Sequence, residues 1–197
     1  MRLTIGVMGS ATAVADEVQD VRLEELGRAI AEHECTLITG ACPGLPYAAV
    51  RGARSAGGLI VGISPGLSRD EHVKKYQSPV EGFDVITYTG SGLMGREIEN
   101  IRSSDIVVIA GGHSGTLGEF AIAYDEGKLI GVLTGTGGVA DAVPELVAIC
   151  AKETGSVVIY DEDPPRLIER LVTYYGQEHY KHPNCFHDPR VTPPRMD

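Results

Sequence analysis

The sequence has no tryptophan among its 197 residues, and aromatic side chains make up only 6% of it. Proteins that bind single-stranded nucleic acid stack bases on aromatic rings, so this scarcity argues against that class. Positive charge is also scarce, since 17 Lys and Arg stand against 27 Asp and Glu, for a net charge of −10. A basic face that neutralises DNA phosphates is not expected, and we predict no nucleic-acid partner.

Long hydrophobic runs and paired cysteines are absent as well. No apolar run approaches the roughly 20 residues that span a bilayer, and residues 1–9 are too short for a signal peptide. The four cysteines form no C-x-x-C pair, which is typical of reduced thiols rather than a disulfide framework. We therefore expect a cytoplasmic protein without a membrane partner.

Two glycine motifs of common enzyme classes are missing, and a third is absent from the position where it acts. G-x-G-x-x-G, which binds the pyrophosphate of NAD, does not follow the first predicted strand. The P-loop pattern G-x-x-x-x-G-K-[ST] and the nucleophile elbow G-x-S-x-G are also absent. These absences argue against NAD binding of the usual kind, P-loop phosphoryl transfer and α/β-hydrolase chemistry.

Glycine itself is abundant, with 25 residues, and it separates β-branched runs from helical patterns. The runs predict strands at residues 3–8, 36–39, 59–63, 84–88, 105–110, 129–133 and 157–160. Helical spacing predicts helices at residues 16–33, 47–55, 94–103, 116–126, 139–153 and 164–175. This alternation predicts an α/β fold in which a parallel sheet carries helices on both faces.

Five glycine-rich segments follow predicted strands, at the carboxyl ends where parallel sheets bind ligands. They are Gly9-Ser10, Gly40–Gly44, Gly90–Gly95, Gly111–Gly115 and Gly135–Gly138. Backbone amides in such turns and at helix N-termini bind anions. Any one segment alone is explained better by a tight turn that needs glycine, but the five together predict a pocket of nucleotide size.

Two charged residues near these turns each allow two interpretations. Glu119 is either a catalytic carboxylate or the partner of Thr116 in a capping box at the start of a helix. Arg96 either projects into the pocket or lies in solvent and pairs with Glu97 or Glu99. Apolar residues of the same helix, spaced i, i+4, i+7, are expected to face the core: Met94, Ile98 and Ile101.

These residues resemble a known family. Gly-Leu-Met-Gly-Arg96, an apolar strand and Gly-Gly-x-x-Gly-Thr-x-x-Glu119 are similar to M-x-x-R-K and P-G-G-x-G-T-x-x-E of the LONELY GUY family, once mislabelled lysine decarboxylase. The resemblance covers about residues 3–160. It implies a Rossmann-like, doubly wound, mostly parallel sheet of about seven strands within residues 1–176, followed by a Pro- and His-rich tail at 177–197.

The resemblance also implies an activity, the cleavage of nucleoside 5′-monophosphates into a free base and ribose 5-phosphate. Arg96 and Glu119 are implied as the catalytic pair, because a carboxylate near C1′ stabilises or attacks the oxocarbenium centre. No metal or cofactor is required. The residues implied to hold the phosphate and nucleotide are Gly9, Ser10, Gly40, Gly44, Met94, Gly111, Gly112, His113, Ser114, Gly115 and Thr116.

The chain departs from this enzyme pattern at Glu97, which replaces a Lys, and at Ala110, which replaces a Pro. The helix after Glu119 is also short. These features resemble the shorter branch of the superfamily, which includes molybdenum-cofactor carrier proteins. They imply, as an alternative, a non-catalytic protein that binds a nucleotide or the molybdenum cofactor, a pterin. The resembling proteins are dimers or larger, so we expect a homodimer or larger homo-oligomer.

Two further segments are open to interpretation. Residues 64–82 form either a lid over the pocket or a helical excursion with a solvated face. The tail contains residues with zinc-ligand spacing, His179, His182, Cys185 and His187. Its prolines favour an extended arm for dimerisation, and we predict no metal site.

Overall fold

The computed structural model describes residues 2–11 and 17–179. Strands lie at β1 (Thr4–Gly9), β2 (Thr36–Thr39), β3 (Leu59–Ser64), β4 (Val85–Tyr88), β5 (Ile106–Ala110), β6 (Leu129–Leu133) and β7 (Val157–Asp161). Helices lie at α1 (Glu17–Glu32), α2 (Leu45–Ser55), α3 (Arg69–Lys74), α4 (Gly92–Arg102), α5 (Ser114–Asp125), α6 (Gly138–Cys150) and α7 (Pro164–Gln177). The predicted alternation of strands and helices is confirmed.

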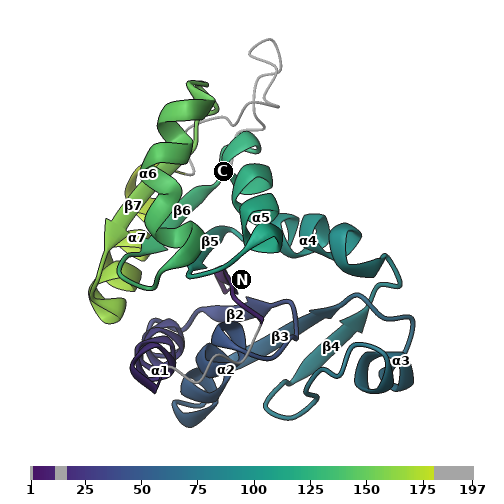
Figure 1. Ribbon diagram of the computed structural model, residues 1–197. Coiled ribbons are helices and arrows are strands. Elements are labelled where there is room, and N and C mark those ends of the chain that lie inside the picture. Colours follow the sequence, from purple (N-terminus) through teal and green to yellow (C-terminus); the bar gives the residue numbers. More distant parts are fainter. Residues whose placement is uncertain (1, 12–16, 180–197) are drawn as a thin grey trace, which may run out of the picture.

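The strands form one sheet in the order β4-β3-β2-β1-β5-β6-β7, and every neighbouring pair is parallel. The predicted doubly wound sheet is thus confirmed, and it is wholly rather than mostly parallel. The chain builds outward from β1 to β4 and then returns through α4 to β5, on the other side of β1 (Figure 1). Since crossovers are right-handed, α1 and α2 of the first half lie on one face, and α5 and α6 of the second half lie on the other. The last helix, α7, returns to the first face and packs against α1.

The core consists of two apolar layers, one on each face of the sheet. One layer lies beneath α1, α2 and α7, and the other beneath α4, α5 and α6. Alternate residues of β5 enter the two layers: Val108 belongs to the first and Ile109 to the second. This is why the β5 sequence is apolar on both faces, as a central parallel strand requires.

Helices α2, α4 and α5 each begin two residues before the predicted start. Their first turns contain Leu45-Pro46, Gly92-Leu93 and Ser114-Gly115. Glycine, serine and proline have weak helix propensity inside a helix, so the sequence pattern begins only after them. In the folded chain these residues form the helix starts that face the carboxyl edge of the sheet.

Residues 64–82 contain the short helix α3, so the helical excursion describes this segment. Ser68 caps the helix by accepting a hydrogen bond from the Glu71 N–H. His72 is fully buried and connects Ser64, whose Oγ lies 2.8 Å from Nδ1, with Pro79, whose carbonyl oxygen lies 2.9 Å from Nε2. These bonds hold the segment against the carboxyl end of β3.

The predicted core face of α4 is partly wrong. Ile101 is buried, but Met94 is 79% exposed and Ile98 is 40% exposed. The buried side chains of this helix include Arg96 and Asn100 instead. The physical reason is that α4 turns its polar face toward a cavity at the sheet edge. Within the described residues, no helix is both long and apolar enough to cross a bilayer.

Candidate ligand-binding site

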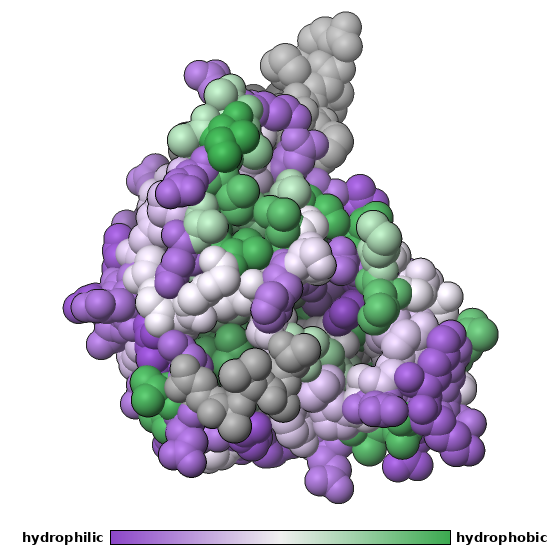
Figure 2. Space-filling model, viewed as in Figure 1, coloured by the Kyte–Doolittle hydropathy of each residue, from purple (hydrophilic) through white to green (hydrophobic). Residues whose placement is uncertain are grey.

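A cavity of about 230 Å³ opens where β1 and β5 end side by side. Gly9 and Ala110 are paired at this edge, and the chain leaves the two strands toward opposite faces of the sheet. Doubly wound folds bind ligands in the crevice formed in this way. The space-filling view shows the hollow between the two groups of helices (Figure 2).

Arg96 is buried in the cavity wall, with only 8% of the residue exposed. Its guanidinium lies against Gly40, where an added Cβ would be 1.3 Å from Nη1. Gly40 is therefore required for the close approach of Arg96. The Nε of Arg96 is buried and has no hydrogen-bond partner among the described residues. The interpretation of Arg96 as a solvated residue is wrong.

Glu119 lies on α5 and is only 6% exposed. Burial raises its pKa to about 7, Glu97 acts in the same direction, and Arg96 and the amide of Asn100 act in the opposite one. The capping-box interpretation is wrong, because α5 begins at Ser114 and its N-cap is His113. Glu119 instead faces the cavity.

The N-terminus of α5 points into the cavity without a side-chain cap. Helix geometry leaves the amides of its first turn without intrahelical partners, so they are donors for an anion. The preceding turn depends on Gly112, which has φ of 100° and would place a Cβ 2.4 Å from Thr116. Both features favour a bound oxyanion at the α5 N-terminus.

The N-terminus of α6 differs, because its donors are already used. The amides of Val139 and Ala140 donate to the carbonyls of Gly112 and Gly111. Asp141 accepts hydrogen bonds from Gly135 and Gly137 in the turn before the helix. The segment 135–138 therefore supports the Gly111 turn and leaves no anion site of its own.

Asn100 forms a buried polar contact beside Glu119. It is fully buried, its Nδ2 donates to the Met8 Sδ at 3.0 Å, and its Oδ1 has no partner among the described residues. A thioether sulfur is a weak acceptor. Arg96 lines the cavity, and Asn100 lies one turn further along α4, outside the lining; each has a buried polar atom without a partner among the described residues. The unpaired group of Arg96 is typical of a site completed by a ligand.

The cavity brings most predicted residues together but not all. It is lined by Gly9, Ser10, Gly40, Arg96, His113, Gly115, Thr116 and Glu119. Predicted residues outside the lining are Gly44, Met94, Gly111, Gly112 and Ser114. Lining residues that the prediction missed are Val7, Met8, Ala11, Cys42, Pro46 and Glu97. All of these lie within two positions of a predicted residue, so proximity to the glycine turns and to Arg96 is the signal that identifies them.

The remaining candidates lie elsewhere. No residue of 64–82 lines the cavity, so α3 is not a lid in this conformation. His182, Cys185 and His187 of the tail lie outside the described residues. Within residues 2–11 and 17–179, no group of three His, Cys, Asp or Glu side chains has the geometry of a metal site.

A sequence model of the SLOG cluster4 family matches residues 2–168. The chain belongs to the SLOG cluster4 family. The match spans the whole lining of the cavity. It agrees with the resemblance to the LONELY GUY-like superfamily and its shorter branch, which is confirmed.

Individual relatives of this SLOG cluster4 protein give the same picture. An uncharacterised protein of Archaeoglobus fulgidus is 34% identical over 131 residues, which make up 66% of this chain and 80% of that protein. The molybdenum cofactor binding protein of Rippkaea orientalis has a TM-score of 0.72 and 27% identity, over 88% of this chain and 97% of that chain. The molybdenum cofactor carrier protein of Chlamydomonas reinhardtii has a TM-score of 0.72 and 29% identity, over 90% of this chain and 100% of that chain.

Proposed function

We propose that the chain is a carrier that binds a phosphorylated ligand of the nucleotide or pterin type, with the molybdenum cofactor as its cargo. The observation that carries this proposal is the buried Arg96, whose Nε has no partner among the described residues and lies beside the uncapped N-terminus of α5. A guanidinium and a helix N-terminus are both typical phosphate-binding groups. The two solved molybdenum-cofactor proteins support the choice of cargo.

The residues of the cavity fit a phosphorylated pterin. Its phosphate is placed at the amides of Ser114, Gly115 and Thr116, with Arg96 as the second source of charge. A volume of about 230 Å³ is below the roughly 300–1,000 Å³ that encloses a drug-sized ligand. The cavity therefore encloses only part of the ligand and leaves the rest exposed, as transfer to an acceptor protein requires.

Native mass spectrometry of the purified chain tests this proposal. We expect retention of one ligand per chain after incubation with molybdenum cofactor released from a molybdoenzyme, and after incubation with nucleoside monophosphates. Inorganic phosphate should compete with each ligand, because it occupies the same helix terminus. The proposal is wrong if neither class of ligand is retained at any phosphate concentration.

A phosphoribohydrolase is the second candidate, and Glu119 favours it. A carboxyl group with a pKa of about 7 has both protonation states available near neutral pH, as acid–base catalysis needs. The protonated carboxyl group donates a proton to the departing base as the C1′–N bond breaks, and the carboxylate left behind stabilises positive charge at C1′. A water molecule then adds to C1′ and gives ribose 5-phosphate. Chromatography of AMP and GMP digests should detect free base, and Glu119→Gln should release it at least about a hundredfold more slowly. If the native chain releases no base from AMP or from GMP, the phosphoribohydrolase is excluded for these substrates and the carrier proposal remains.

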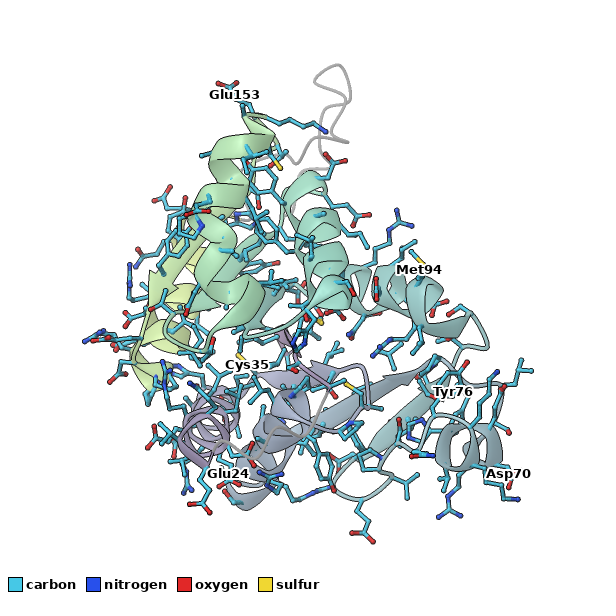
Figure 3. The ribbon with its side chains drawn as sticks, viewed as in Figure 1. Glu24, Cys35, Asp70, Tyr76, Met94 and Glu153 are labelled. Carbon is cyan, nitrogen blue, oxygen red and sulfur yellow. The ribbon has the colours of Figure 1, made fainter. Side chains whose placement is uncertain are left out.

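We propose a second copy of the chain as the partner of an apolar face on α4 and α5. Its exposed side chains are Leu93, Met94, Ile98 and Leu117. Hydrophobic side chains gather over α4, α5 and α6 in Figure 2, and Met94 lies at the outer side of α4 in Figure 3. Light scattering should detect a dimer that Met94→Glu dissociates, while Val73→Glu on α3 leaves it intact. A monomeric native chain contradicts the assignment.

We also propose that the carrier acts in the cytoplasm and that residues 1–176 form its binding domain. Free thiols at Cys35 and Cys42 are typical of a reducing compartment. A chain truncated after Gln177, where α7 ends, should retain the ligand as the whole chain does. Loss of binding on truncation assigns a ligand-binding role to the tail.

A further inference from the structure

Glu97 lines the cavity beside Arg96, and it forms no hydrogen bond or ion pair with any described residue. Its carboxylate lies against the first turns of α5, on a surface left open by two glycines. A Cβ on Gly115 would be 3.2 Å from Oε1, and a Cβ on Gly118 would be 3.0 Å from Oε2. Both carboxylate oxygens of Glu97 are therefore close to a helix face that lacks side chains.

This carboxylate lacks hydrogen-bond donors. Burial raises the pKa of Glu97, and the neighbouring charge of Arg96 acts in the opposite direction. An ionised carboxylate is an acceptor only, with two oxygens to satisfy. Leaving a partly buried carboxylate without donors is unfavourable. A ligand that brings two adjacent N–H groups into the cavity supplies what Glu97 lacks.

We infer that Glu97 is a specificity-determining residue, which accepts two hydrogen bonds from the 2-amino-4-oxo edge of a guanine or pterin ring. The inference rests on the proposed function, because the phosphate at α5 and Arg96 is what holds the ligand in the cavity. The edge in question presents a ring N–H beside an exocyclic amino group. These two parallel donors match the two oxygens of one carboxylate.

The same geometry selects against adenine. The corresponding edge of adenine has an amino donor beside a ring nitrogen that only accepts, so its lone pair faces one oxygen of Glu97. A site with polar groups left unpaired rejects the wrong ligand strongly. The Lys at this position in the LONELY GUY pattern is a donor, and its replacement by Glu97 inverts the hydrogen-bonding character of the position.

Calorimetric titration of the full chain with GMP, IMP and AMP tests the inference, since these ligands carry identical phosphates. Affinity should fall in that order, with GMP bound about tenfold or more tightly than AMP. IMP keeps the ring N–H but lacks the amino group, so it should lie between them. In Glu97→Gln one acceptor becomes a donor, which matches adenine, and the preference for GMP should be lost or reversed.

Glu99→Gln is the matched control, because it removes the same charge from α4 but lies outside the cavity lining. This control should keep the native preference, and thermal unfolding should verify that both variants are folded. Equal affinities of the native chain for GMP and AMP overturn the inference while the proposed function stands. A change in Glu97→Gln that is equal for both nucleotides also overturns it, since that is a pure charge effect. If the native chain binds none of the three nucleotides, the proposed nucleotide binding fails with it.

Discussion

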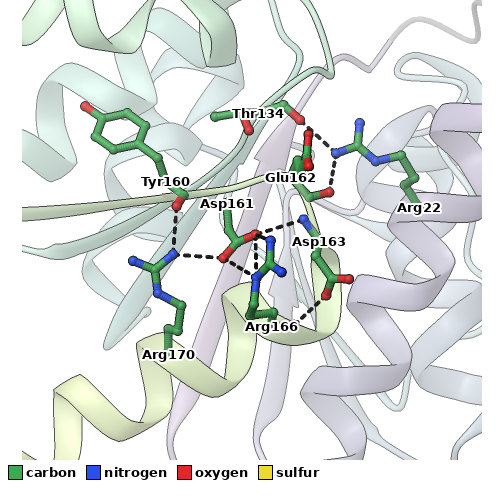
Figure 4. Close-up of polar contacts among 8 residues, drawn as sticks. All are labelled: Arg22, Thr134, Tyr160, Asp161, Glu162, Asp163, Arg166 and Arg170. Atoms are coloured by element: carbon green, nitrogen blue, oxygen red, sulfur yellow. Dashed lines mark hydrogen bonds and ion pairs between the residues drawn. The ribbon is translucent and has the colours of Figure 1, made fainter.

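Asp161 and Glu119 are both buried carboxylates near the carboxyl edge of the sheet, yet their surroundings are opposite. Asp161 ends β7 and accepts hydrogen bonds from Arg166, Arg170 and the amide of Asp163 (Figure 4). Hydrogen bonds from Arg166, then from the Asp163 amide and from Arg170, hold the pKa of Asp161 far below its usual value against the opposing effect of burial. Glu119 has no ion pair with any described residue, and burial raises its pKa to about 7.

The comparison separates a structural carboxylate from a binding one. The Asp161 cluster satisfies its own charge, and Arg22 ties the ends of β6 and β7 together beside it by donating to the carbonyls of Thr134 and Glu162 (Figure 4). The cavity around Glu119 instead leaves atoms of Arg96 and Asn100 without partners among the described residues. A saturated network stabilises the fold, whereas an unsaturated one has free groups for a ligand.

The largest effect is expected at Arg96. Arg96→Ala should weaken binding of a nucleoside monophosphate several hundredfold, because it removes a buried charge that faces the phosphate, worth about 3 to 4 kcal/mol. Isothermal calorimetry measures the loss. Gly40→Ala should weaken binding as well, since its Cβ would displace the guanidinium. Arg102→Ala, which breaks an ion pair with Glu126, is the control and should bind the nucleotide with native affinity. Native affinity in Arg96→Ala would contradict the assignment of the phosphate site.

Glu119→Gln should stabilise the fold at pH 8. The pKa of Glu119 rises from 4.5 to about 7 on folding, so ionisation destabilises the native state once the pH exceeds 4.5. The destabilisation is complete above pH 7 and amounts to at most about 3 kcal/mol. Urea unfolding should find the variant more stable at pH 8 and nearly equal to the native chain at pH 4.5. An advantage that does not depend on pH contradicts the raised pKa.

Asp161→Asn should instead destabilise the fold. The free energy of unfolding should fall by about 2 kcal/mol at pH 7, because the charged hydrogen bonds of Asp161 are lost. The folded-state pKa is lowered, so the stabilisation is present above the unfolded value of 3.8 and is lost as the pH falls below it. Urea unfolding at pH 7 and pH 3 should therefore give a smaller difference at the lower pH. A loss that stays constant over this range indicates a packing defect instead.

The smallest effect on stability is expected at Thr136, which connects the turn after β5 with the end of β6. Its Oγ1 accepts a hydrogen bond from the Gly111 amide at 2.8 Å and donates to the Leu133 carbonyl at 2.6 Å. Thr136→Val leaves the Gly111 amide buried without a partner and should destabilise the fold by about 1 kcal/mol. Thr136→Ser keeps the hydroxyl and should therefore retain most of the native stability. Equal melting temperatures for Val and Ser variants contradict this role.

The class of the fold could be predicted because its signals are local. Alternating runs such as residues 106–110 identify buried strands, and the glycine turns mark their carboxyl ends. Helix starts could not be predicted to the residue, since Ser114 and Gly115 have weak propensity and are helical only because the β5 connection is short. The orientation of α4 could not be predicted from its hydrophobic periodicity either, because polar and apolar residues share its surface.

The sequence by itself determined the parallel α/β architecture, the positions of the glycine turns, and the selection of Arg96 and Glu119 as residues of interest. Only the tertiary structure decided that these two side chains are buried in one cavity, that Glu97 enters it and that Met94 does not. The physical reason is that hydrophobic periodicity and turn chemistry act over a few neighbours. The burial of a charge depends on strands and helices far apart in the chain, which meet where β1 and β5 end.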